Sequence, residues 1–117
     1  MTTILKEAHE KATFAAAEAA LAFMDKHFGG GDGGLCGFAW VTYYPSAKGN
    51  TRDGRAERKL MESVGFRADY TGKNWQLWNP SKVSAQSVDA KYAGALAYAQ
   101  VLEAEAGIKV YAGERLD

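Results

Sequence analysis

The stretch KGNTRDGR, residues 48–55, combines residue types that suit the binding of an anion. An amphipathic segment follows it, which predicts that a helix begins here. The start of a helix is its positive end and favours carboxylates, yet Lys48, Arg52 and Arg55 stand here against the single acid Asp53. Backbone N–H groups at a helix start bind phosphate, and arginine adds bidentate hydrogen bonds. The stretch therefore predicts an anion site, the alternative being solvated cations that pair with nearby acids.

A second candidate is the aromatic segment TGKNWQLWNPSK, residues 71–82. Trp75 and Trp78 are three residues apart on an expected strand, so they point to opposite faces and only one need be in the core. Aromatic rings beside cations and amides suit the stacking and edge recognition of a base. The candidate residues are Lys73, Trp78, Asn79 and Ser81, together with Tyr44 from the preceding strand. The alternative is a sheet whose aromatic face packs beneath the helices.

The last residues, YAGERLD, hold a third candidate. Gly113 is interpreted as a turn, and Arg115 as a side chain that reaches a ligand from a neighbouring subunit. The alternative is an ordinary frayed terminus.

Other reactive residues do not form a recognisable catalytic or metal site. His9 and His27 are five helical turns apart, about 27 Å, and cannot share a metal ion. Cys36 lies in an apolar strand and is expected to be a buried small hydrophobe. We therefore expect no catalytic residue, no metal and no cofactor.

Composition narrows the class of protein. The chain has 117 residues, which predicts one domain spanning 1–117. Fourteen basic residues balance fourteen acidic ones, which argues against DNA binding. A single cysteine fits a reducing compartment, and the start of the chain lacks the pattern of a signal peptide. The longest apolar run is too short to span a membrane, so we expect a cytoplasmic protein without a membrane partner.

Periodicity predicts an α+β protein with a small mixed sheet of about four strands packed with three helices, in the order α-β-α-β-β-α-β. The expected elements are a long helix over 3–27, a strand over 35–44, a helix over 53–64, a hairpin over 66–78, a helix over 88–106 and a strand over 108–113.

The long N-terminal helix has two apolar sides. One carries the bulky residues Phe14, Ala17, Leu21, Met24 and Phe28, and the other carries Leu5, Ala12, Ala16, Ala19 and Phe23. Either the chain covers both sides itself, or one side is an oligomer contact.

Several segments of the chain resemble a family of small bacteriophage proteins. These segments are GGLCGFAWV, NTRDG, TGKNWQLWNPS, QSVDAKYAGALAYAQVLEAEAG and YAGERLD. The resemblance covers most of the chain after residue 33. It departs from the family at Glu114, where a serine is expected. The family is similar to phage immune-evasion sponges, which hold cyclic dinucleotide signals of the CBASS defence pathway without hydrolysing them. The resemblance implies a homo-oligomer, a dimer or tetramer with sites between subunits, in the cytoplasm of an infected bacterium.

The sequence hypothesis is thus a cytoplasmic, oligomeric protein that sequesters a cyclic nucleotide. Phosphate would be bound by Lys48, Arg52 and Arg55, and the bases would stack on Tyr44 and Trp78. The edges of the bases or riboses would be recognised by Lys73, Asn79 and Ser81. Arg115 would reach the ligand from a neighbouring subunit. The main alternative is a small inhibitor that blocks a host defence protein through the same residues. An enzyme and a virion component are further alternatives.

Overall fold

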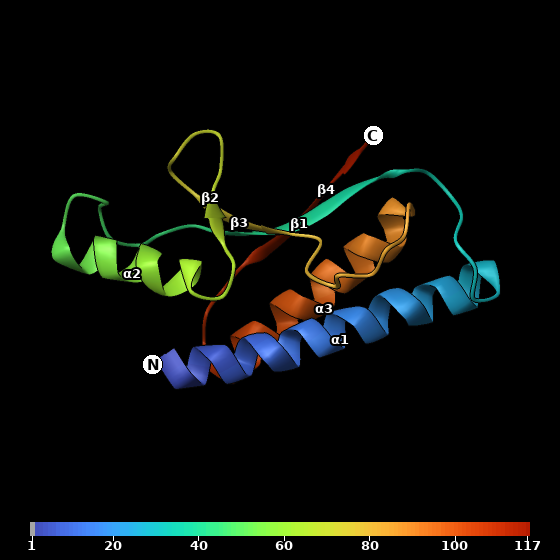
Figure 1. The fold of residues 1–117 in the computed structure, drawn as a ribbon, viewed down its shortest axis with the longest axis horizontal. Coiled ribbons are helices and arrows are strands. Elements are labelled where there is room, and N and C mark those ends of the chain that lie inside the picture. The colour runs from blue at the N-terminus through green and yellow to red at the C-terminus, as the bar shows by residue number, and fades with distance from the viewer. Residues whose placement is uncertain (1) are drawn as a thin grey trace.

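The computed structural model describes residues 2–117 and shows an α+β fold with the predicted order of elements (Figure 1). Three helices accompany a four-stranded antiparallel sheet. The elements are α1 (Thr2–Phe28), β1 (Gly37–Tyr43), α2 (Arg52–Glu62), β2 (Arg67–Ala68), β3 (Trp75–Trp78), α3 (Val88–Ala106) and β4 (Tyr111–Leu116).

The sheet has the order β2-β3-β1-β4, with β1 hydrogen-bonded to β3 on one side and to β4 on the other. After α1 the elements run β-α-β-β-α-β, the connection order of split βαβ, ferredoxin-like folds. The position of α2 is unusual for this order, because α2 lies beyond one end of the sheet while α1 packs beside α3 (Figure 1).

The core lies between α1, α3 and one face of the sheet. The two helices run antiparallel, as the pairing of His9 with Tyr98 and the approach of Ala16 to Gly94 show. Small side chains on α1 allow this close approach. The buried residues of α1 are Leu5, Ala8, Ala12, Ala16, Ala20 and Met24.

Of the two apolar sides predicted for the first helix, the alanine-rich one therefore packs inside the chain. Two residues of the bulky side point away from the core, with Phe14 67% exposed and Leu21 54% exposed. Met24 from that side is buried.

The side chains of β1 alternate between the two faces of the sheet. Gly37, Ala39 and Val41 are buried beneath α3, whereas the neighbouring Phe38 points to the uncovered face. A Cβ atom on Gly37 would lie 2.5 Å from the Arg115 carbonyl oxygen, so the backbone of β4 approaches this glycine closely. The prediction that Cys36 is buried was wrong, because it points to the uncovered side and is exposed.

The last strand was placed too early. It spans Tyr111–Leu116 rather than 108–113, and so includes most of the residues interpreted as a tail. Gly113 is not a turn but pairs with Trp40 inside the sheet. The register could not be read from local patterns because it depends on pairing with β1, which runs from Gly37↔Leu116 to Thr42↔Tyr111.

Local capping explains where α2 and α3 begin and end. The Thr51 side chain accepts a hydrogen bond from the Gly54 N–H at the start of α2, and Ser87 accepts one from the Ala90 N–H at the start of α3. Gly107 ends α3 in the left-handed conformation. No helix within residues 2–117 is both long and apolar enough to cross a membrane.

The contact between α1 and α3 includes a titratable pair. Nδ1 of His9 lies 2.7 Å from the hydroxyl of Tyr98, whose side chain is buried. Burial of His9, reinforced by the charge of Lys82, lowers its pKa below the ordinary value of 6.5. In the tautomer that leaves Nδ1 unprotonated, the neutral imidazole accepts from the tyrosine hydroxyl, and protonation of the ring removes that acceptor.

This pair predicts that stability falls as the solution is acidified. Because the folded state resists protonating His9, the unfolded state binds more protons below about pH 6.5, and unfolding is favoured there. We expect thermal melts to show a lower midpoint at pH 5.5 than at pH 7.5 in the wild type. The change should be much smaller in His9→Gln and retained in His27→Gln. An equal pH response in His9→Gln would contradict the prediction.

Candidate binding surface on the uncovered sheet face

The face of the sheet that points away from α3 is here named the open face. Cross-strand partners share a face of a sheet, so the register defines its members. They are Phe38, Trp40, Thr42, Gln76, Trp78, Tyr111, Gly113 and Arg115, with Tyr44 continuing the row beyond β1. Five of these nine residues are aromatic.

Two tryptophans form the centre of the open face. Trp40 and Trp78 are cross-strand partners whose ring centroids are 4.8 Å apart with planes tilted by 31°. A Cβ atom on Gly113 would lie 2.8 Å from the Trp40 indole, so the ring rests closely on the backbone of β4. Trp78 is 47% exposed, and its Nε1 donates to Gln76 at 3.2 Å. The two rings thus give a ready platform for stacking.

One end of the open face brings cations next to an aromatic ring. The Arg115 guanidinium and the Lys91 ammonium each lie 5.7 Å from the centre of the Phe38 ring. Phe38 also packs edge-on against Trp78, with centroids 5.9 Å apart. Positive charge therefore adjoins the tryptophan platform.

The other end carries a second aromatic pair. Tyr44 and Tyr111 have ring centroids 5.6 Å apart, and both are more than half exposed. Trp40 and Tyr44 are four residues apart on an extended chain, so the two platforms are separated by about 13 Å.

The charged side chains among the strand residues of the open face are positive. Its strand residues include Arg115 but no aspartate or glutamate, although the chain holds fourteen acids. Arg67 belongs to the same side of β2, but its guanidinium turns back to the carbonyl oxygens of Glu62 and Phe66. The open face is therefore aromatic and mildly basic.

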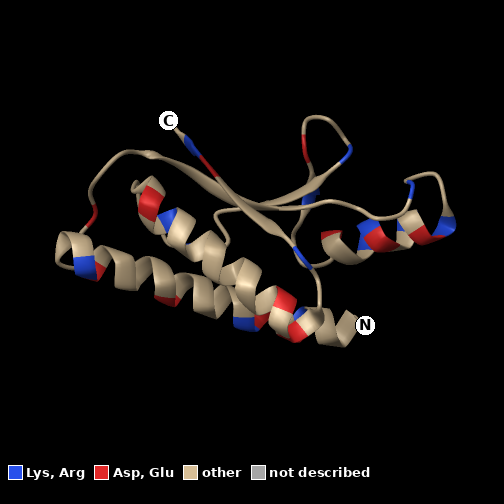
Figure 2. Ribbon diagram, turned by 180° about the vertical axis from the view of Figure 1, so that it is seen from behind, with Lys and Arg blue, Asp and Glu red and all other residues tan. Residues whose placement is uncertain are grey.

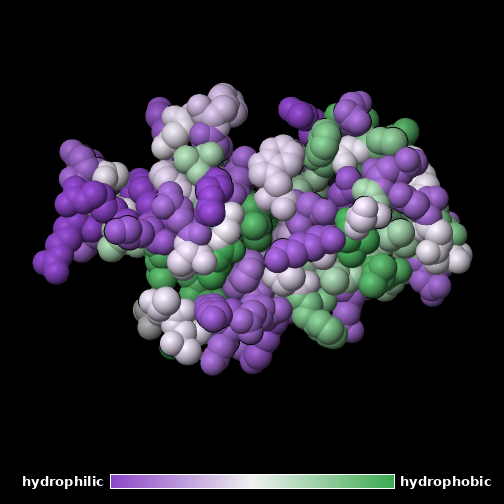
Figure 3. All heavy atoms as spheres, in the orientation of Figure 1, coloured by the Kyte–Doolittle hydropathy of each residue, from purple (hydrophilic) through white to green (hydrophobic). Residues whose placement is uncertain are grey.

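The cations at the start of α2 lie at the opposite end of the molecule from the C-terminus (Figure 2). The loop before α2 folds tightly against it, since a Cβ atom on Gly54 would lie 1.8 Å from the Lys48 carbonyl oxygen. The Arg55 guanidinium donates to the Asn50 carbonyl oxygen at 3.0 Å. Arg52 is exposed, and the space-filling view shows this end of the molecule as strongly hydrophilic (Figure 3).

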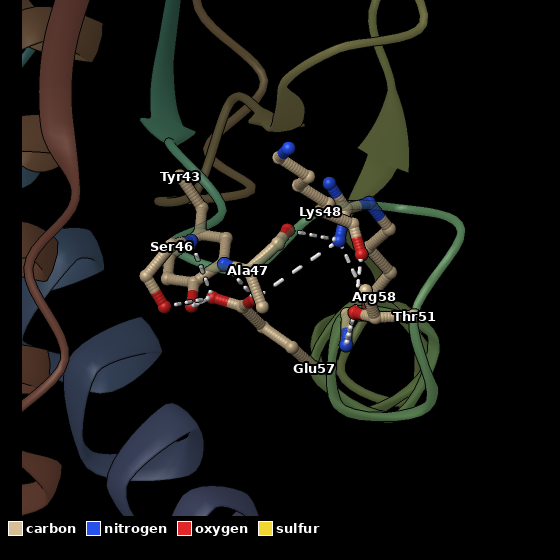
Figure 4. A network of polar contacts seen from close by, with 8 residues as sticks. Tyr43, Ser46, Ala47, Lys48, Thr51, Glu57 and Arg58 are labelled. Carbon is tan, nitrogen blue, oxygen red and sulfur yellow. Dashed lines mark hydrogen bonds and ion pairs between the residues drawn. The ribbon is translucent and has the colours of Figure 1, made fainter.

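The most extensive polar network here surrounds Glu57 and ties the loop to α2 (Figure 4). The Glu57 carboxylate accepts from the Tyr43 hydroxyl, from Ser46 N–H at 2.8 Å and hydroxyl at 3.0 Å, and from Ala47 N–H at 3.0 Å. Burial alone would raise the pKa of Glu57, but these hydrogen bonds outweigh it and lower the pKa. Burial and the bond to Glu57 raise the pKa of Tyr43.

A neighbouring arginine completes this network. The Arg58 guanidinium donates to the carbonyl oxygens of Ala47 and Gly54, each at 2.9 Å, and lies 5.3 Å from the centre of the Trp75 ring. Trp75 is buried and its Nε1 donates to Glu62 at 3.0 Å. Of the two tryptophans of β3, Trp75 thus holds α2 and Trp78 is presented on the surface.

The Glu57 network predicts a stability effect. Glu57→Ala leaves the Tyr43 hydroxyl and two N–H groups without their acceptor, so we expect a loss of about 2–3 kcal/mol in the free energy of unfolding. Urea denaturation measures it. Glu18→Ala, which removes an exposed glutamate of α1, should stay within about 0.5 kcal/mol of the wild type. Equal values for the two variants would show that the network contributes little.

Two other predicted contacts are occupied within the chain. The Asn79 amide donates to the Val83 carbonyl oxygen at 3.1 Å, and its oxygen accepts from the Ser81 hydroxyl at 3.0 Å. Ser81 is buried against Gly94 of α3. The NPS motif therefore anchors the loop after β3. Lys73 is exposed in the β2–β3 turn.

The predicted site residues thus fall into separate places. The open face collects Tyr44, Trp78 and Arg115, while Lys48, Arg52 and Arg55 gather at α2. Sequence reasoning did not include Lys91, Phe38 or Tyr111 in the site. The alternation of β1 was a signal for Phe38, but Lys91 and Tyr111 join only through tertiary packing and the register of β4.

Within residues 2–117 no three histidine, cysteine, aspartate or glutamate side chains gather as metal ligands. Comparisons with known proteins found no matching family model, no matching curated protein and no matching solved structure.

Proposed function

We propose that the protein binds a nucleotide signal without transforming it, and that the open face is the binding surface. A cyclic dinucleotide is the ligand class that the sequence resemblance implies. The observation that carries the proposal is the gathering of five aromatic side chains on an uncovered sheet face whose strand residues lack carboxylates.

This surface matches the chemistry of a nucleotide. Bases of every type stack on aromatic side chains, and each stacked base contributes about 1–3 kcal/mol to the binding free energy. Four-stranded antiparallel sheets that expose aromatic rings bind bases in this way in other proteins. The absence of acids among the strand residues of the open face avoids repulsion of phosphate.

The placement of charge suggests how the ligand lies. A base stacked on Trp78 puts its phosphate within reach of Arg115 and Lys91, because both cations flank the adjacent Phe38. The cations at α2 lie at the end of the molecule opposite the C-terminus, which follows Arg115 by two residues. We therefore assign phosphate binding to Arg115 and Lys91, and we keep Arg52 as the competing assignment.

Thermal stabilisation of purified protein by a panel of cyclic di- and trinucleotides tests the proposal. Ligand that binds only the native state raises the melting temperature by mass action. Recovery of unchanged ligand by chromatography supports sequestration, and altered ligand indicates an enzyme. Arg115→Ala should reduce the shift and Arg52→Ala should preserve it; the reverse result would place the phosphate at α2.

An inhibitor of a host defence protein is the second candidate. Tryptophan, tyrosine and arginine are also the residues that dominate binding energy between proteins, and they are exposed together on the open face. This candidate predicts no stabilisation by any nucleotide.

A further inference from the structure

Within the described part of the chain, β4 forms one edge of the sheet and is paired on one side only. The opposite edge is β2, which has two residues and is shielded by the turned-back Arg67 side chain. In contrast β4 has six residues and no proline, and within residues 2–117 no strand pairs with its outer side. Exposed edges of this length are templates for pairing with another strand.

The groups available for such pairing follow from the register. The Asp117 N–H donates to the Cys36 carbonyl oxygen, so the odd-numbered residues of β4 direct their backbone groups to β1. The even-numbered residues Ala112, Glu114 and Leu116 therefore direct theirs outward.

We propose that β4 pairs with β4 of a second copy of this chain, antiparallel about a twofold axis at Gly113. In that register Ala112 and Glu114 of one copy exchange backbone hydrogen bonds with Glu114 and Ala112 of the other. The two sheets become one sheet of eight strands. This proposal stands independently of nucleotide binding.

Several β4–β4 registers would leave the open faces of both copies on the same side of the joined sheet. The types of the opposed residues favour the register centred on Gly113. Centring on Gly113 places Lys109 opposite Asp117 and Tyr111 opposite Arg115 of the other copy, as opposite-charge and cation–aromatic pairs. Centring on Glu114 would set two glutamates against each other. Centring on Ala112 would set Arg115 against Lys109. All three registers obey a twofold axis, and of the three only the first sets opposite charges against each other.

The helix side of the sheet supports the same register. Leu116 is 58% exposed and lies on that side, because it pairs with the buried Gly37. In the proposed dimer it falls opposite Val110 of the other copy. Val110 lines a hollow between α3 and the start of β4, together with Ala99, Gln100, Glu103, Lys109 and Tyr111. An apolar side chain from the second copy thus meets a hollow beside β4.

The proposed pairing has a consequence for the open face. A twofold axis perpendicular to the sheet keeps both open faces on the same side, and Arg115 of each copy then lies beside Tyr111 of the other. The aromatic surface becomes continuous across the dimer.

Light scattering after size exclusion tests the oligomeric state of the full chain. We expect a dimer for the wild type and for Glu114→Ala, and a monomer for Glu114→Pro. Proline removes only an outward N–H, and proline is tolerated on edge strands. Circular dichroism checks that Glu114→Pro retains the fold. A wild-type monomer, or a folded Glu114→Pro dimer, would overturn the proposal.

A disulfide test reads the register itself and does not depend on the proline variant. In a Cys36→Ser background, Tyr111→Cys/Arg115→Cys should form a covalent dimer on mild oxidation, because directly opposed residues that do not share hydrogen bonds have Cα atoms about 4.5 Å apart. Each single cysteine variant should stay uncrosslinked, since like positions lie about 13 Å apart. Failure of the double variant to crosslink, or equal crosslinking of a single variant, would overturn the register.

Discussion

Replacement of Trp78 by alanine is expected to weaken nucleotide binding by about 5- to 150-fold. The indole forms half of the platform with Trp40 and is 47% exposed, so its loss removes stacking on one base, a contribution of about 1–3 kcal/mol. Isothermal titration with the cyclic dinucleotide that stabilises the wild type most strongly measures the change.

The matched control is Tyr70→Ala. Tyr70 is a fully exposed aromatic residue in the turn between β2 and β3, away from the platform. Its removal should leave the affinity unchanged. Equal losses in Trp78→Ala and Tyr70→Ala would point to nonspecific adhesion to aromatic surface rather than to a site on the open face.

Replacement of Gly37 by alanine is expected to destabilise the fold by about 2–4 kcal/mol. The new Cβ would lie 2.5 Å from the Arg115 carbonyl oxygen and 2.8 Å from the Val88 Cβ atom. Both neighbours are fixed by secondary structure, so β4 and the start of α3 must shift to accept the methyl group. Chemical denaturation measures the loss.

Gly31→Ala serves as the control for this prediction. Gly31 is exposed, and the atom nearest to its added Cβ is the Phe28 carbonyl oxygen at 3.5 Å, an ordinary contact. Its stability should stay within about 0.5 kcal/mol of the wild type. A Gly37→Ala variant as stable as Gly31→Ala would show that β1, β4 and α3 are packed less tightly than described.

Local patterns predicted most of the fold. The helix over 88–106 was placed at its observed bounds, where Ser87 caps its start and Gly107 ends it. The alternation of β1 assigned its two faces correctly. The opposite orientations of Trp75 and Trp78 followed from their spacing alone, and the structure confirms them.

The sequence predictions that were wrong depend on tertiary contacts, which local sequence patterns do not reveal. The bounds of β4 depend on pairing with residues 37–42, far away in sequence. Asn79 and Ser81 have the chemistry of ligand contacts, but tertiary packing turns them inward to hold a loop. The cations at α2 were expected beside the aromatic residues, whereas α2 lies beyond one end of the sheet and away from the C-terminus.

The structure shows in part what the cations at the start of α2 do. The helix start is already capped by the Thr51 side chain, and Arg55 and Arg58 donate to loop carbonyl oxygens. These bonds fold the loop over Gly54. The side chain of Arg52 remains exposed at the tip.

The central claim is that bases stack on the open face, and the indole N–H signals of the protein test it most directly. Trp40 and Trp78 lie on the open face, whereas Trp75 is buried beside α2. Titration with the stabilising cyclic dinucleotide, followed by ¹⁵N–¹H NMR, should move the indole signals of Trp40 and Trp78 and leave that of Trp75 in place. Movement confined to Trp75 and the backbone amides of α2, or no movement at all, would contradict the account.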